Sequence, residues 1–220
     1  MEILRAKTLD LRQTGELTPE QSANGTLNQE EALKQNTILK SAPRRLVLEL
    51  TNRCNLNCVM CGRNAADFQP TQFQMEWLKY FEPVRNLVEE VTLMGWGEPT
   101  VHPDFVEFLR WAYESGMRKY FCTKGMRLEQ LTPALFEYHT DIFAVSLDGA
   151  EEKTNQSIRR GSDFHKILKA LEQINRKKAQ EHLEYPYNNF VFTAMKQNIR
   201  ELPALVRLAG DIGVNEVKAV

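Results

Sequence analysis

The chain has 220 residues, a formal net charge of −1 and a hydrophobic fraction of 42%. This length allows one domain with a sizeable core. Basic and acidic residues are interspersed along the sequence, which argues against a binding surface for nucleic acid or anionic membranes. Residues 1–5 lack the features of a signal peptide, and no apolar run is long enough to span a membrane. We therefore expect a cytoplasmic protein.

Residues 1–43 form a polar accessory segment. Thr18 and Asn28 each resemble a helix N-cap, because Gln21 and Glu31 follow three residues later. Three arrangements remain open for this segment. It packs over the sheet predicted below, covers the cysteine-rich stretch, or is partly disordered.

Residues 44–220 alternate between short apolar runs and helical patterns, which is typical of an α/β domain with a parallel sheet. Helical stripes of apolar residues lie between the runs, at residues 105–112, 164–174 and 202–212. Pro83 should kink or split a further helix over residues 75–88. The predicted strands are residues 46–51, 91–94, 118–123, 142–147, 190–195 and 216–220.

Three cysteines, Cys54, Cys58 and Cys61, follow the first predicted strand within eight residues. Such thiols favour iron–sulfur clusters or zinc over calcium and magnesium, which prefer oxygen ligands. A structural zinc site needs a fourth Cys or His, and Cys122 and the four histidines are isolated in sequence. A [4Fe–4S] cluster held by three thiolates would leave one iron open for another ligand. With only four cysteines in all, a disulfide framework is not expected.

Further polar and glycine-rich residues follow the next predicted strands. Ligands of parallel α/β sheets bind at the carboxyl ends of the strands. After the second strand comes Gly95-Trp96-Gly97-Glu98-Pro99, where glycines allow close backbone approach and Glu98 can accept a hydrogen bond from an ammonium group. Thr123 ends the third strand. Ser146 and Asp148 end the fourth and share one face by strand alternation.

The Cys54-x-x-x-Cys58-x-x-Cys61 spacing and the glycine-rich loop resemble the radical S-adenosylmethionine (SAM) superfamily. Together with the Ser146-Leu147-Asp148-Gly149 strand end, they are most similar to its MoaA/PqqE/SPASM-type branch. This resemblance implies a partial (βα)6 TIM-like barrel with an N-terminal helical extension. It also implies a [4Fe–4S] cluster that cleaves SAM reductively to a 5′-deoxyadenosyl radical, which abstracts hydrogen from a substrate. The cofactor supplies this chemistry, and the protein positions it.

The resemblance also implies the site residues. Cys54, Cys58 and Cys61 would hold the cluster, and an external electron donor such as flavodoxin or ferredoxin would reduce it. Arg159 is preferred over Arg160 for the SAM carboxylate. The substrate is an unidentified peptide, sugar or cofactor precursor, and no catalytic residue is assigned. The implied SAM contacts are Met60, Gly95, Gly97, Glu98, Pro99, Thr123, Ser146, Asp148 and Arg159.

Two further expectations complete the interpretation. The alternative function is a non-catalytic zinc-binding interaction domain, with one distant residue as the fourth ligand. In addition, Val220 falls inside the sixth predicted strand, and an apolar strand at a sheet edge without its covering helix would be unprotected. We therefore expect the core domain to be truncated at this strand and to belong to a longer protein.

Overall fold

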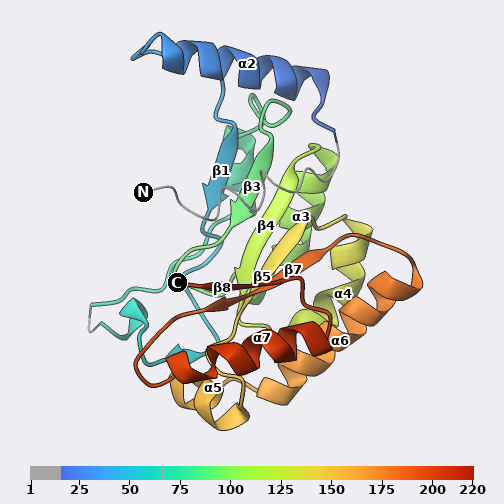
Figure 1. Cartoon of the computed structure of the whole chain (residues 1–220). Helices are drawn as coiled ribbons and strands as arrows, with labels where there is room; N and C mark the ends of the chain where they lie inside the picture. Colours follow the sequence, from blue (N-terminus) through green and yellow to red (C-terminus); the bar gives the residue numbers. More distant parts are fainter. Residues whose placement is uncertain (1–15, 66) are drawn as a thin grey trace.

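A six-stranded parallel sheet forms the centre of the protein in a computed structural model that describes residues 16–65 and 67–220. Its strands follow one another in chain order across the sheet (Figure 1), and each pairs with its neighbours in parallel. The α/β prediction is confirmed, and all six predicted strands are present. They are β1 (Arg45–Leu48), β3 (Glu90–Leu93), β4 (Arg118–Thr123), β5 (Ile142–Ser146), β7 (Tyr187–Phe192) and β8 (Glu216–Ala219).

Helices pack on one face of this sheet and form the main core with it. Alternate strand residues such as Val91, Phe121 and Phe190 meet the apolar stripes of the helices there. Within the described part of the chain, no helix is both long and apolar enough to cross a membrane. The packing helices are α3 (Phe105–Glu114), α4 (Leu128–Glu137), α6 (Phe164–Gln180) and α7 (Leu202–Asp211).

The other strand residues form a second, smaller cluster on the opposite face. Tyr120, Ile142, Ala144 and Tyr187 are its buried members, and Cys122 packs against them. Strands β1 and β8 are the two edges of the sheet, and no strand pairing joins them among the described residues. The sheet is therefore open, in agreement with the expected partial barrel.

Several local predictions need correction. Helix α2 (Pro19–Leu33) begins at the Thr18 cap as predicted, but it runs through Asn28, so the second predicted start was wrong. Residues 75–88 contain only the 3-10 helix η2 (Met75–Tyr80), since Pro83 lacks the N–H that a longer helix requires. Helices α4 and α5 (Glu152–Ile158) were not predicted.

Helix α2 packs against the amino ends of the strands. Gln21 donates from Nε2 to the carbonyls of Val88 (2.8 Å) and Gly116 (3.1 Å), which precede β3 and β4. Asn24 bonds to both the N–H and the carbonyl of Ala42. These bonds satisfy backbone groups where the strands begin. In the described part of the accessory segment, residues 16–43, helix α2 therefore packs against the sheet. Residues 1–15 of the segment lie outside the described residues.

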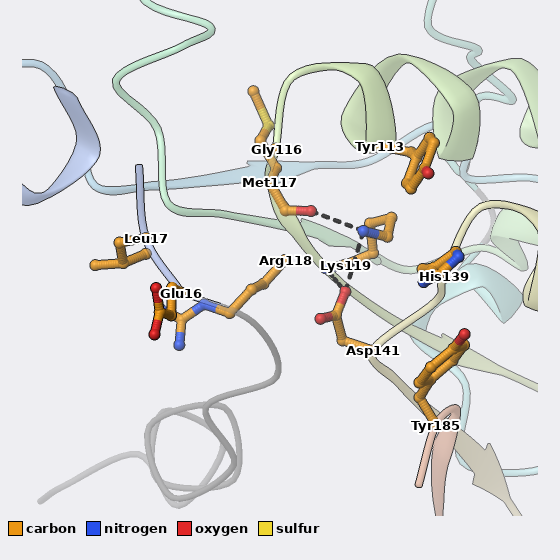
Figure 2. A pocket seen from close by; sticks show the side chains of 10 residues that line it. All are labelled: Glu16, Leu17, Tyr113, Gly116, Met117, Arg118, Lys119, His139, Asp141 and Tyr185. Carbon is orange, nitrogen blue, oxygen red and sulfur yellow. Dashed lines mark hydrogen bonds and ion pairs between the residues drawn. The ribbon is translucent and has the colours of Figure 1, made fainter. Parts of the chain in front are cut away.

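A buried ion pair lies at the same end of the sheet. Figure 2 shows the Lys119 ammonium between the Asp141 carboxylate, 3.1 Å away, and the Met117 carbonyl, 2.8 Å away. His139 stacks between Tyr113 and Tyr185, with ring centroids 5.4 and 4.8 Å apart. These groups line a cavity of about 280 Å³. The pair joins the starts of β4 and β5.

Replacing Lys119 should destabilise the protein strongly. The change Lys119→Met removes the ammonium group from the buried pair with Asp141, which we expect to lower the free energy of unfolding by about 3 kcal/mol. Lys177→Met is the matched control, because the Lys177–Glu181 pair is exposed on α6. Urea unfolding measures the free energy of unfolding of both variants. Equal losses would show that the buried pair contributes no more stability than the exposed one.

Candidate metal and cofactor site

A cavity of about 270 Å³ lies at the carboxyl ends of the strands, opposite α2. Cys54, Cys58 and Cys61 all line it, so the fold brings the three predicted metal ligands to one place. The strand ends supply the other walls. The remaining lining residues are Met60, Arg63, Met94, Gly95, Trp96, Gly97, Cys122, Lys124, Ser146, Arg159, Val191, Thr193 and Val220.

The loop that carries the cysteines, residues 54–62, is pinned by a short antiparallel ribbon. Its strands are β2 (Asn57–Cys58) and β6 (Arg159–Arg160), with Cys58 directly opposite Arg159. Beside the ribbon, the Val59 N–H donates to the Ile158 carbonyl (2.9 Å). The loop is therefore fixed to a segment that lies about one hundred residues later in the chain.

Hydrogen-bond donors lie beside two of the three thiols. The Leu56 N–H donates to Cys54 Sγ at 3.4 Å, and the Arg159 guanidinium lies 3.9 Å from Cys58 Sγ. Burial raises the pKa of the Cys54 thiol, while the Leu56 hydrogen bond and the Arg63 charge oppose this rise. Bound metal would displace the thiol protons. The Leu56 N–H and the Arg159 guanidinium would then stabilise the resulting thiolates.

Arg159 also forms a buried ion pair with Asp148 just behind the cavity wall. The Arg159 Nε atom lies 2.8 Å from Asp148 Oδ2, and both side chains are almost fully buried. The second carboxylate oxygen of Asp148 accepts the Thr193 N–H at 2.8 Å. This arrangement orients Arg159 between the end of β5 and Cys58.

Glu98 joins the glycine-rich loop to the end of β4. Its buried carboxylate accepts hydrogen bonds from the Thr123 hydroxyl (2.7 Å) and the Lys124 N–H (2.6 Å). Gly97 lies directly against the backbone of Thr51 and Arg53, and any side chain there would overlap their carbonyl oxygens. A glycine is therefore required where this loop crosses the end of β1.

The predicted SAM contacts divide into two groups. Met60, Gly95, Gly97, Ser146 and Arg159 line the cavity. The other four, Glu98, Pro99, Thr123 and Asp148, are buried and do not line it. Their direct contact with SAM remains a prediction. In the structure, Glu98 bonds to Lys124 and Asp148 pairs with Arg159, and both of these partners line the cavity.

Other lining residues were not assigned to the site from the sequence. Cys122 was interpreted as a small buried residue, yet its thiol lines the cavity 3.4 Å from the Ser146 hydroxyl. Strand alternation offered a signal, because it puts Cys122 and Lys124 on one face. Arg63, which donates to the Leu56 carbonyl at 2.8 Å, follows Cys61 by two residues.

The zinc alternative requires ligands that converge on a single ion. Among the described residues, no three Cys, His, Asp or Glu side chains are grouped closely enough to hold one. A [4Fe–4S] cluster makes a different demand, because each thiolate binds its own iron. The structure therefore offers no zinc site in support of the alternative.

The structure thus brings three cysteines of an α/β domain into one cavity at the strand ends, where the sequence predicted a metal cofactor. The model of the radical SAM superfamily matches residues 48–209. The chain therefore belongs to this family, as its motifs predicted.

Relatives within the family have several functions. The chain is 27% identical over 179 residues to the AdoMet-dependent heme synthase of Methanosarcina barkeri, covering 80% of this chain and 49% of that protein. It is 32% identical over 142 residues to the mycofactocin maturase MftC of Mycobacterium tuberculosis, covering 60% and 34%. Thus the chain spans about half or less of the length of these relatives.

Solved structures share the fold at lower sequence identity. The structure of Streptococcus suis SuiB bound to the precursor peptide SuiA matches with a TM-score of 0.69 and 18% identity, covering 98% of this chain and 48% of that one. SuiB has also been solved bound to S-adenosylmethionine, with a TM-score of 0.67. At this identity the similarity establishes the fold.

Replacing Arg159 should be costly even without a cofactor. Arg159→Met leaves the buried Asp148 carboxylate without its cation, so we expect the free energy of unfolding of the apo protein to fall by about 3 kcal/mol. Arg160→Met, at the exposed neighbouring position, should change it by less than about 0.5 kcal/mol. Chemical denaturation measures both. If the two variants unfold alike, the ion pair does not hold this part of the fold together.

Proposed function

We propose that this chain is the core of a radical SAM enzyme that binds a [4Fe–4S] cluster through Cys54, Cys58 and Cys61. The observation that carries the proposal is that these thiols share one cavity with Gly95, Gly97, Ser146 and Arg159. When bound, the cluster supplies the electron for reductive cleavage of SAM to a 5′-deoxyadenosyl radical, which abstracts hydrogen from the substrate.

The charge of the cavity supports this assignment. Arg63, Lys124 and Arg159 line it, whereas none of its described lining residues is an Asp or Glu. Three thiolates with their cluster, and the carboxylate of SAM, would place negative charge here. Arg159 suits the SAM carboxylate because a guanidinium can form two parallel hydrogen bonds to it.

The remaining polar groups orient or bind the nucleoside part of SAM in this proposal. Ser146 offers a hydroxyl to the ribose, and Met60, which is partly exposed at the rim, offers an apolar contact to the adenine. Glu98 would bind the SAM ammonium group only through a change in its present hydrogen bonds. Asp148 acts through Arg159.

Two partners complete the proposed reaction. An external electron donor such as flavodoxin or ferredoxin would approach the cavity where Met60 and Trp96 are exposed. The hydrogen donor is a peptide, sugar or cofactor precursor. The SuiB structure with a precursor peptide supports the first of these classes, and the heme synthase relative supports the third.

The first test concerns the cluster. After anaerobic reconstitution with iron and sulfide, Cys54→Ala, Cys58→Ala and Cys61→Ala should each be poor in iron and lack the broad absorption near about 400 nm, because too few thiolates remain. Cys122→Ala is the matched control and should keep both signals. Loss of the cluster in Cys122→Ala with retention in any of the other three would contradict the assignment.

The second test concerns SAM. Reduced holo-protein without substrate should slowly release 5′-deoxyadenosine and methionine, measured by chromatography. Ser146→Ala should weaken SAM binding by about 1 kcal/mol through loss of one hydrogen bond, with the iron content unchanged. Ser157→Ala removes an exposed hydroxyl on α5 and should bind SAM like the unaltered protein. Failure of fully loaded, reduced protein to release deoxyadenosine would overturn the proposed activity.

A further inference from the structure

Trp96 occupies an unusual position at the cavity. Its side chain is 63% exposed, yet it lines the cavity that contains the three cysteines. The outer edge of its indole ring lies directly on Gly62, the residue that follows Cys61. A large apolar side chain thus bridges the glycine-rich loop and the cysteine loop.

The contact at Gly62 leaves no room for a side chain. A β-carbon added to Gly62 would lie 2.6 Å from Cζ3 and 2.9 Å from Cη2 of Trp96. Gly62 does not have a positive φ, so its backbone does not need glycine for conformational reasons. A side chain at this position would therefore displace the Trp96 ring.

Trp96 is also held through its backbone. Its N–H donates a hydrogen bond to the Glu49 carboxylate, just beyond the end of β1. Gly95 packs against the same carboxylate so closely that a side chain there would overlap it. Glu49 thus holds the backbone of Trp96, while the edge of the indole ring contacts the cysteine loop at Gly62.

We infer that the Trp96 indole closes the side of the cavity next to Cys61. It would thereby restrict access of solvent and oxygen to the cluster. The inference rests on the proposed function, because it requires the cluster. The apolar shell around a metal site controls the entry of solvent. Here the glycine-rich loop contributes the indole of Trp96 to that shell. The ring packs against Gly62 of the cysteine loop.

The inference predicts that substitutions at Gly62 and Trp96 act through one contact. Gly62→Ala should push the ring outward into solvent, and Trp96→Ala should remove it. In anaerobically reconstituted protein transferred to aerated buffer, each change should raise the rate at which the cluster absorbance bleaches by roughly tenfold. The double variant should bleach no faster than Trp96→Ala, since the added methyl group then meets no ring.

Three controls separate this contact from general effects. Gly210→Ala adds a methyl group on α7 where no atom lies within 4 Å, and Tyr80→Ala removes an exposed aromatic ring elsewhere. Both should bleach like the unaltered protein. Trp96→Phe should give an intermediate rate, because the shorter ring covers part of Gly62.

Anaerobic release of iron to a chelator should follow the same order, with thermal unfolding of the apo variants unchanged.

The outcomes distinguish the inference from the proposed function. If the unaltered protein takes up no cluster, the proposed function fails. If the cluster forms but Gly62→Ala and Trp96→Ala leave its bleaching rate unchanged, or their effects multiply in the double variant, Trp96 does not close the cavity and the inference is overturned.

Discussion

The pairing of Cys58 with Arg159 is the contact on which the candidate site depends. The cysteine loop contains only two residues of regular strand, although it has local bonds such as that from the Cys61 N–H to the Cys58 carbonyl (3.1 Å). Pairing with β6 joins the loop to a distant segment, and β6 is in turn tied to the end of β5 by the Arg159–Asp148 ion pair. Buried ion pairs add little net stability, but breaking one is costly. The pair therefore serves chiefly to fix the position of the thiols relative to the sheet.

A second connection, through Glu98, fixes the glycine-rich loop relative to the same strand ends. Its carboxylate holds the end of β4, while its backbone N–H donates to the Arg53 carbonyl at 2.8 Å, next to Cys54. One residue thus spans three consecutive strand ends. An acidic residue beside Gly97 would be needed here for structural reasons even without a cofactor. The acidic residue of the glycine-rich loop thus has a structural role at the strand ends.

The sequence was most informative where a single physical rule determines the structure. The four inner strands, β3, β4, β5 and β7, are mostly buried on both faces, so they stand out as apolar runs. The thiols were found through their spacing. In contrast, β2 and β6 are two residues long and exist only because distant segments pair. Helix α4 contains Pro133, which weakens its helical pattern.

The placement of Asp148 shows a limit of strand alternation. Alternation puts Ser146 and Asp148 on one face only while the strand continues, and β5 ends at Ser146. Beyond that point the chain direction is set by contacts with Arg159, Thr193 and Asn198, which come from three later segments. Such contacts depend on the folded structure, and a local pattern contains no information about them. The same reason explains why Arg63 and Trp96 were not assigned to the site.

Structural contacts lie at the amino ends of the strands, and the candidate site lies at their carboxyl ends. At the amino ends, the Gln21 and Asn24 amides and the Lys119–Asp141 pair bind neighbouring elements tightly, so this end can change little without loss of the fold. At the carboxyl ends, loops joined by a few long-range contacts surround a cavity lined by cations. Substitutions in that lining, at Lys124 or Thr193 for example, leave the main core untouched. The fold therefore allows substitutions on this rim without disturbing the strands and helices of the main core.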